Sequence, residues 1–365
     1  MRTSATVFDD LQHLLSKERE IEDFLAERAG EIALDSEFQR ERSFHPKLAL
    51  VQLCCGGRTV LIDTLALPRS PALIGMLTDR RREKLMHAPG EDLETFAHAL
   101  GALPEPLFDT QIAAALAGLG HGLGYAALVW QLLGIEVAKD QTRSDWLRRP
   151  LSSEQLRYAA EDVRHLPEIA ARLRETLGRL GRLGWLEEEC QRMVAAARGE
   201  LPAAPPHHEF TALAFAPEIV QRRLLRILLW RENRARARDL PQRWLLSDES
   251  CVRIAYEPPS REETLLAGLG PRERLHRSEA KTLLAALSST AEGEEPFRPI
   301  PRPLEPSARD QLRRLSAAVA ALAAEHGLPP PLLAPRRWLE AHLRGETPMP
   351  LRSGWRSVLL ASLIG

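Results

Sequence analysis

The sequence predicts an α/β domain built on a mixed β-sheet that is flanked by helices, followed by two small all-α domains. Three observations lead to this fold class. Strand-like segments follow one another closely between residues 31 and 63, and strand and helix patterns alternate from there to residue 110. After residue 210 no segment has the pattern of a strand, and apolar residues recur at helical spacing.

The first part of the chain contains a predicted antiparallel meander. An amphipathic helix ends near Gly30, and the strands after it are separated by the turn signals His45-Pro46 and Gly56-Gly57. Links this short favour antiparallel neighbours. The predicted elements are a helix at 9–28 and strands at 31–38, 47–54 and 58–63.

After Asp63 the pattern changes to alternating helices and strands, and later to helices alone. Ser152 and Gln155 form a capping-box pattern at the start of a long amphipathic helix, in which Pro167 predicts a kink. A meander joined to alternating elements predicts a mixed sheet. The predicted elements are helices at 69–79, 91–100, 151–179 and 185–198, strands at 84–88 and 107–109, and helical structure from Thr110.

Two proline-rich stretches divide the chain. The first ends the α/β domain, and the second lies between two groups of helical segments. The predicted helices are 217–237, 247–256, 261–268 and 278–289 in one group, and 308–326 and 335–344 in the other. The predicted boundaries are a domain at 1–200, a linker at 201–209, a helical domain at 210–291, a linker at 292–306 and a second helical domain at 307–365.

Composition narrows the function classes. The 365 residues carry a net charge of −1, so the chain as a whole gives no electrostatic argument for nucleic-acid binding. The four cysteines form no C-x-x-C pair, which argues against a zinc site and suits a reducing compartment. The N-terminus lacks the apolar segment of a signal peptide, and no window is long and apolar enough to span a membrane. We therefore expect a cytoplasmic protein that needs no membrane.

Asp35 and Glu37 are the first candidate site residues. They stand two apart in a predicted strand, so their side chains leave the same face and lie side by side. Two neighbouring carboxylates repel each other unless a proton or a cation intervenes, and Mg²⁺ prefers oxygen ligands. An isolated D-x-E is common, however, and taken alone the pair more often faces water.

Three further residues are candidates for the same acidic site. Asp92 opens a predicted helix, where an acidic residue is also favoured by the helix dipole. Tyr158 and Asp162 are i, i+4 neighbours and share one face of their helix. Each of these residues has an ordinary structural explanation when it is considered alone.

Their order along the chain resembles a known family. D-x-E on an early strand, an acid that opens a helix about 55 residues later and Y-x-x-x-D on a late helix resemble the DEDD exonucleases of the Tyr subclass, and within them the bacterial ribonuclease D family. The matching motifs are Ile32-Ala-Leu-Asp-Ser-Glu-Phe38, Leu48-Ala-Leu-Val-Gln-Leu53, His87-Ala-x-x-Glu-Asp-Leu93, Phe108-Asp-Thr-Gln111, Thr142-Arg-Ser-Asp-Trp-Leu147 and Arg149-Pro-Leu-Ser-x-x-Gln-Leu-x-Tyr-Ala-Ala-x-Asp-Val163.

The resemblance implies a ribonuclease H-like sheet and a two-metal-ion 3′–5′ exoribonuclease. By this resemblance Asp35, Glu37, Asp92 and Asp162 hold two Mg²⁺ ions, for which Mn²⁺ can substitute, and Tyr158 orients the attacking water. The implied activity releases 5′ nucleoside monophosphates stepwise from RNA 3′ ends, in the maturation of tRNA precursors and other structured RNAs. No oligomer is required for it. Ser36, which lies between the two acids on the opposite face, is expected to serve packing only.

The helices after residue 209 resemble an HRDC domain through Leu229-Trp-Arg-Glu232, Ala237-Arg-Asp239 and Leu246-Ser-Asp248. The segment 307–365 resembles a second, divergent one. Eight arginines between 222 and 243, with few acids near them in sequence, predict a basic face for RNA phosphates. The expected RNA-contacting residues are Gln111, Arg143, Trp146, Arg226 and Arg231.

Two alternatives remain open at this stage. The same carboxylates would hydrolyse DNA, because recognition of a 2′-OH needs hydrogen bonds that a sequence does not place. A non-catalytic nucleic-acid-binding protein with a degraded nuclease fold is the other alternative, and the presence of all four acids and Tyr158 argues against it.

Overall fold

The computed structural model describes residues 14–137, 144–291 and 294–364. Within these ranges the chain forms two compact units. The sheet unit comprises the described residues of 14–39, 47–201 and 304–364, and the helical unit comprises those of 40–46 and 202–303. The last helices of the chain thus belong to the same compact unit as the sheet.

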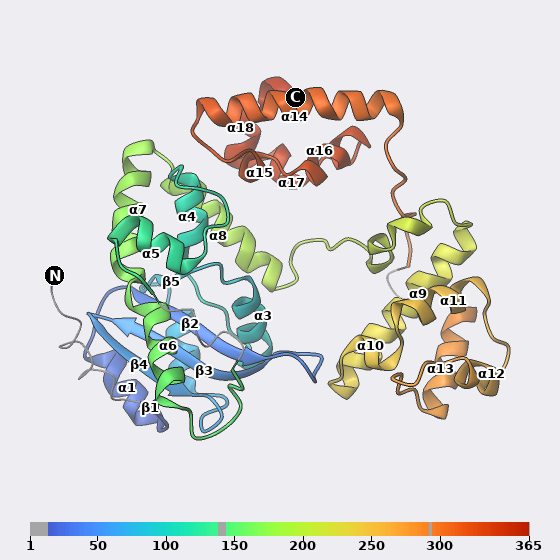
Figure 1. The fold of residues 1–365 in the computed structure, drawn as a ribbon, viewed down its shortest axis with the longest axis horizontal. Helices are drawn as coiled ribbons and strands as arrows, with labels where there is room; N and C mark the ends of the chain where they lie inside the picture. The colour runs from blue at the N-terminus through green and yellow to red at the C-terminus, as the bar shows by residue number, and fades with distance from the viewer. Residues whose placement is uncertain (1–13, 138–143, 292–293, 365) are drawn as a thin grey trace. The chain divides into compact units, whose positions relative to one another are not determined.

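The sheet unit contains a six-stranded mixed sheet with the strand order β1-β4-β3-β2-β5-β6 (Figure 1). Strands β2, β3 and β4 form the predicted antiparallel meander, while the β1–β4, β2–β5 and β5–β6 pairs are parallel. The predicted mixed sheet is therefore confirmed. The strands are β1 (Leu14–Leu15), β2 (Ile32–Gln39), β3 (Lys47–Cys55), β4 (Arg58–Asp63), β5 (Lys84–Met86) and β6 (Leu107–Asp109).

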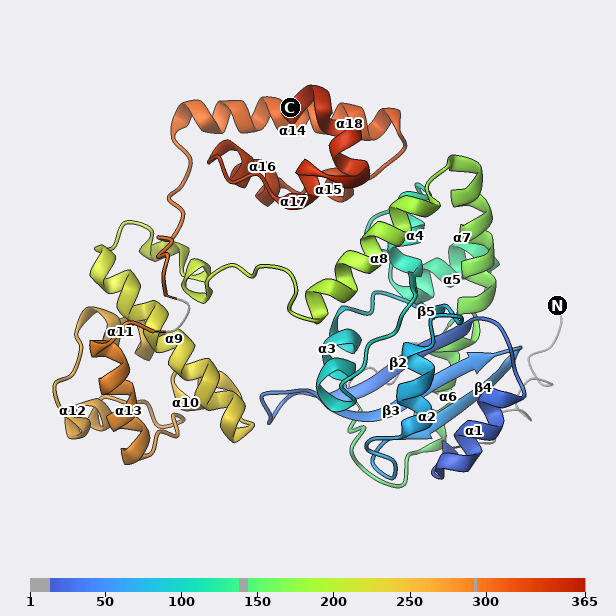
Figure 2. The same ribbon diagram turned by 180° about the vertical axis from the view of Figure 1, so that it is seen from behind.

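Helices cover both faces of this sheet. Helix α6 (Ser153–Arg164) packs across β2, β3 and β4 on one face, and α3 (Gly90–Ala99) packs on β2 and β3 from the other (Figures 1 and 2). Strand β3 is buried at every position except Lys47, as expected for a central strand covered on both faces. The core of the unit therefore lies on both sides of β2 and β3.

The long helix predicted at 151–179 is two helices, α6 and α7 (Leu166–Leu180). The predicted capping box at the start of α6 is present, because Gln155 N–H donates to Ser152 Oγ and Ser152 N–H donates to Gln155 Oε1. The break falls at His165, two residues before Pro167. The remaining helices of this part are α1 (Glu18–Ala26), α2 (Pro71–Thr78), α4 (Thr110–Leu116), α5 (Tyr125–Leu133) and α8 (Leu183–Ala197).

The helix predicted at 9–28 is wrong in its first part. Leu14 and Leu15 form the edge strand β1, which pairs in parallel with Leu61 and Ile62, and the helix begins at Glu18. The local sequence pattern does not reveal this strand pairing, because the partner strand lies more than forty residues away in the chain. Residues 9–13 lie outside the described ranges.

The C-terminal helices of the sheet unit are anchored to α8. The Trp355 ring stacks on Trp185 with centroids 4.7 Å apart, and the buried Arg356 guanidinium forms an ion pair with Glu189. Gly354 has a positive φ of 76°, and a Cβ there would clash with the Glu188 carboxylate, which accepts from Trp355 N–H. These helices are α14 (Pro306–Glu325), α15 (Pro330–Leu333), α16 (Arg336–Leu343), α17 (Met349–Arg352) and α18 (Gly354–Ile364).

The helical unit has its own core around α9 (Glu218–Arg238). The loop 40–46 belongs to this unit, and the backbone N–H groups of Phe44 and His45 donate to the Asp239 carboxylate at the end of α9. The described residues after Leu201 form helices and loops only, as predicted. The other helices of this unit are η2 (Pro206–Glu209), η3 (Thr211–Leu213), α10 (Gln242–Leu245), α11 (Asp248–Tyr256), α12 (Glu262–Ala267) and α13 (Arg277–Ser288).

None of the helices in the described ranges is both long enough and apolar enough to cross a membrane.

Candidate active site

Three carboxylates meet where α6 crosses β2. Asp35 and Glu37 leave the same face of β2, because they are two residues apart in an extended strand. Asp162 reaches the same place from α6, and one carboxylate oxygen of each residue lies within 4.8 Å of the others. The strand period and the helix above it thus bring together three of the predicted site residues.

The surroundings of these carboxylates favour their protonated forms. Burial, followed by the charges of Asp92, Asp162 and Glu37, raises the pKa of Asp35 well above its usual range. Burial and the charges of Asp162 and Asp92 raise the pKa of Glu37 to about 9. Burial raises the pKa of Asp162 to about 7. The group therefore needs protons or a positive ion in order to stay together near neutral pH.

The donor set fits a hard divalent cation. Among the described residues, no arginine or lysine forms an ion pair or hydrogen bond with Asp35, Glu37 or Asp162. Carboxylate oxygens are the ligands that Mg²⁺ and Mn²⁺ take in proteins, and the fold brings three of them close enough to hold such an ion. The chain thus supplies negative charge at this place and leaves the positive charge to an ion from solution.

Asp92 approaches from the opposite face of the sheet. Its carboxylate accepts a hydrogen bond of 2.5 Å from Ser36 Oγ, and Ser36 points away from Asp35 and Glu37 because it lies between them in the strand. Burial raises the pKa of Asp92 to about 6. Asp92 is close enough to raise the pKa of Asp35, but it is not one of the three carboxylates within 4.8 Å. The expectation that Ser36 serves packing only is wrong, because its hydroxyl holds Asp92.

Tyr158 lies one turn before Asp162 on α6 and forms a hydrogen bond with it. Burial and the charge of Asp162 raise the pKa of the Tyr158 hydroxyl above its usual value, so the phenol stays protonated. Trp146 packs beside it, with ring centroids 6.2 Å apart, and is only 3% exposed. The indole therefore supports the Tyr158 ring from within the core, and its burial does not suit the expected contact with nucleotides.

Tyr125 is a residue of this region that the sequence analysis did not single out. Its hydroxyl donates to the Glu161 carbonyl at 2.7 Å and accepts from His165 N–H at 3.3 Å. In an uninterrupted helix those two backbone groups would bond to each other. The hydroxyl thus occupies the break between α6 and α7, directly beside Asp162. A tyrosine that inserts into a distant helix leaves no local sequence signal.

Gln111 and Arg143 are the other residues of the sheet unit that were predicted to contact RNA. The Gln111 side-chain amide donates to the Leu123 carbonyl at 3.0 Å, so it holds the loop that precedes α5. Arg143 lies outside the described residues. For Gln111 the structure shows a role within the fold, while its contact with RNA stays a prediction.

Arg226 and Arg231 are engaged inside the helical unit. Arg226 is 13% exposed at its side chain and binds Glu294 at 2.7 Å, and Arg231 is 8% exposed and binds Asp248 at 2.8 Å. The expectation of few balancing acids near these arginines is wrong, since Glu279 also pairs with Arg234 and Arg238. These guanidinium groups join α9 to its neighbours, and we propose no phosphate contact for Arg226 or Arg231.

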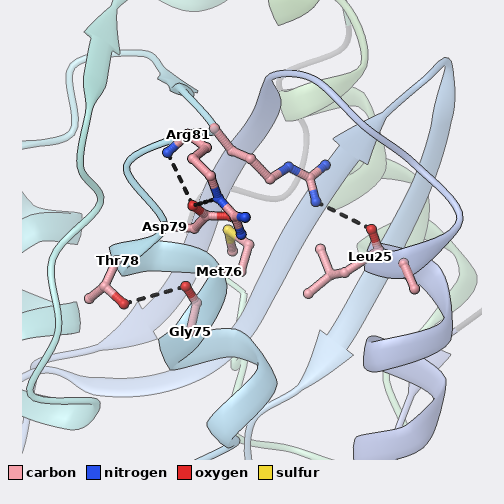
Figure 3. A pocket seen from close by; sticks show the side chains of 8 residues that line it. Leu25, Gly75, Met76, Thr78, Asp79 and Arg81 are labelled. Atoms are coloured by element: carbon pink, nitrogen blue, oxygen red, sulfur yellow. Dashed lines mark hydrogen bonds and ion pairs between the residues drawn. The ribbon is translucent and has the colours of Figure 1, made fainter.

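A surface pocket of about 600 Å³ lies beside α1 and α2 (Figure 3). Its charged side chains already have partners in the protein. Arg81 Nε lies 2.9 Å from the Asp79 carboxylate, and Arg82 donates to the Leu25 carbonyl at 3.3 Å. No predicted site residue lines this pocket, so the carboxylate group on β2 and α6 is the better candidate active site.

Comparison with known proteins agrees with this geometry. Residues 12–178 match a family described as 3′–5′ exonuclease, and this range holds all four acids and Tyr158. The chain is 40% identical over 355 residues to ribonuclease D of Xanthomonas oryzae pv. oryzae, an alignment that covers 97% of this chain and 98% of the relative. The chain belongs to the ribonuclease D family.

Other members of the ribonuclease D family match over most of the chain. Ribonuclease D of a Shewanella species is 35% identical, over 90% of this chain and 87% of that protein. The crystal structure of Escherichia coli RNase D, described as an exoribonuclease involved in structured RNA processing, superposes with a TM-score of 0.82 at 30% identity. It covers 96% of this chain and 97% of its own. The chain is accordingly a hydrolytic 3′–5′ exoribonuclease.

Proposed function

We propose that this ribonuclease D family member hydrolyses RNA at the carboxylate group of β2 and α6 with two divalent metal ions. One observation carries the proposal, namely that Asp35, Glu37 and Asp162 converge within 4.8 Å without a cationic side chain among their described partners. Asp92, held by Ser36, supplies the fourth carboxylate. When bound, divalent ions lower the pKa of a water molecule and neutralise the charge that develops on the departing 3′ oxygen.

The residues of the site have different proposed roles. The charges of all three other acids raise the pKa of Asp35, so Asp35 would hold both ions, and Glu37 and Asp162 would hold the ion that activates the attacking water. Tyr158 keeps its proton and orients that water through its hydroxyl. Trp146 and the core around it hold the Tyr158 ring in place.

The proposed products are 5′ nucleoside monophosphates, released one at a time from RNA 3′ ends. We propose tRNA precursors and other structured RNAs as substrates, because the family to which the chain belongs includes a protein described in structured RNA processing. The four cysteines are free thiols, which suits the reducing cytoplasm as the place of this activity.

The test uses a 5′-labelled RNA with a single-stranded 3′ end, incubated with Mg²⁺ and with EDTA. We expect stepwise shortening with Mg²⁺ only, and chromatography should identify 5′ nucleoside monophosphates as products. Asp35→Ala should abolish both signals. A wild-type protein that shortens no RNA in Mg²⁺ or Mn²⁺ would refute the proposal.

Two further substrates refine the outcome. A DNA oligonucleotide of the same sequence tests selectivity for the sugar, and equal rates on both would extend the activity to DNA. A tRNA precursor with a 3′ extension, compared with the mature tRNA, tests the proposed substrate class. If the protein shortens the oligonucleotide RNA but not the tRNA precursor, the proposed hydrolysis is supported and the proposed role in tRNA maturation is refuted.

A further inference from the structure

Gln52 is a buried side chain whose polar atoms have no partner. It lies on β3, it is 0% exposed, and neither its Nε2 nor its Oε1 forms a hydrogen bond with another residue that the structure describes. Burying an amide without a hydrogen bond is unfavourable, because the amide gives up its hydrogen bonds to water. Native proteins keep few such groups, and each needs an explanation.

The strand register places this amide beside the active site. Gln52 stands directly opposite Asp35 in the antiparallel pair of β2 and β3, and opposite Leu61 on β4. Side chains of directly opposed residues share one face of the sheet, with Cβ atoms about 4.5–5.5 Å apart. The amide of Gln52 therefore lies on the face that carries Asp35 and Glu37, beneath α6.

A packing role does not account for a glutamine at this position. Its neighbours on this face include Leu50, Leu61 and Ala159, which form an apolar cluster around Trp146. Methionine fills nearly the same volume as glutamine, and it would avoid the cost of an unpaired amide. Packing in this cluster therefore does not explain the amide.

We propose that Gln52 is a positioning residue for Asp35, and that its Nε2 donates a hydrogen bond to the Asp35 carboxylate once divalent ions occupy the site. An amide suits this task because it donates without adding charge, whereas a lysine or arginine would compete with the ions for the carboxylate. The inference rests on the proposed function, in which Asp35 is a metal ligand.

The variant that tests this proposal is Gln52→Met, and Thr64→Val is its control. Thr64 follows β4, is 3% exposed, and its Oγ1 is likewise buried without a partner. Both changes remove an unpaired buried polar group, but only Gln52 lies opposite Asp35. Two quantities are measured for each protein, the unfolding midpoint without metal and the Mn²⁺ dissociation constant by calorimetry.

We expect both variants to unfold at the wild-type temperature or above it without metal, because each loses an unsatisfied polar group. Gln52→Met should bind Mn²⁺ about 10- to 100-fold more weakly, the range found for residues that orient metal ligands. Thr64→Val should bind Mn²⁺ like the wild type. Gln52→Glu, which adds a carboxylate of the same shape, should fail to reproduce wild-type Mn²⁺ affinity.

Two outcomes would overturn the inference. A Gln52→Met protein that unfolds earlier than the wild type without metal, or that does not fold, would show that the amide serves the fold. A Gln52→Met protein with unchanged Mn²⁺ affinity would show that the amide does not act on Asp35. Failure of the proposed function has a different signature, since Asp35→Asn would then leave Mn²⁺ binding intact.

Discussion

Carboxylates shielded from water occur in both units of this molecule, and their surroundings differ. Glu294 of the helical unit is buried, whereas Asp35, Glu37 and Asp162 of the active site are half-buried. In the helical unit Glu294 has no exposed side-chain surface and binds Arg226 at 2.7 Å. Burial raises its pKa, but the hydrogen bonds from Arg226 and Ala291 outweigh it, so the pKa of Glu294 lies below its ordinary value. In the active site burial raises the pKa of Glu37 to about 9, and no guanidinium offsets it.

An ion-paired acid of the sheet unit differs from the site carboxylates in the same way. Glu189 in the sheet unit follows the same rule as Glu294, since it is 1% exposed at its side chain and pairs with Arg356. Where the chain provides its own cation, the acid joins helices. Among the described residues the chain provides no cation around Asp35, so this acid is available for an ion from solution.

The largest expected effect comes from neutralising a site carboxylate. Glu37→Gln should lower exonuclease activity by about 10³-fold, the scale seen when one group that stabilises transition-state charge is removed. The same change should leave the metal-free unfolding midpoint at pH 8 unchanged or raised, because the raised pKa of Glu37 means that its carboxyl group must take up a proton on folding at this pH, and glutamine need not. Rate measurements and thermal unfolding of one preparation check both parts. A strongly destabilised Glu37→Gln protein would contradict the distinction between the two kinds of acid.

Removing a structural carboxylate should have the opposite pattern. Glu189→Ala leaves the Arg356 guanidinium buried without its partner, and breaking a buried pair costs about 3–5 kcal/mol of stability. Chemical denaturation measures this loss. Glu187→Ala, on the exposed side of the same helix, is the control and should be nearly neutral. A loss of less than 1 kcal/mol at Glu189 would weaken the rule.

The pH dependence of stability offers a third test. The folded-state pKa values of Glu37, about 9, and Asp162, about 7, lie above their ordinary values. Their contribution to stability is therefore fully present below about pH 4 and is lost as pH rises through 7 and 9. Without metal, we expect the unfolding midpoint to fall by several degrees between pH 5.5 and 9, as an order of magnitude.

Saturating Mg²⁺ should reduce that fall, because the ion takes the place of the protons. The Glu37→Gln protein should show a flatter profile above pH 7 than the wild type. A metal-free midpoint that rises steadily from pH 5.5 to 9 would refute the assignment of these carboxylates as unpaired.

The smallest expected effect lies at an exposed ion pair. Arg243 pairs with Asp248 at 2.7 Å, but its side chain is 78% exposed. Arg243→Ala should change stability by less than about 1 kcal/mol, because water and salt screen such pairs. Denaturation curves at low and at 0.5 M salt check this. A larger loss would mean that side-chain exposure does not predict how much an ion pair contributes to the stability of this molecule.

The sequence by itself was enough to predict the candidate site residues and part of their arrangement. The period of a strand places Asp35 and Glu37 on one face, and the period of a helix places Tyr158 above Asp162. These relations are local, so they hold whatever the rest of the fold does. The order of the four acids also sufficed to indicate the ribonuclease D family.

Only the tertiary structure decided the partners of these residues. Arg226 meets Glu294 across 68 residues of chain, so no sequence window showed that this arginine is paired. The hydrogen bond between Ser36 and Asp92 and the position of Gln52 opposite Asp35 depend on helix packing and strand register. Such contacts are set by the packing of the whole core, and for that reason the local sequence pattern did not contain them.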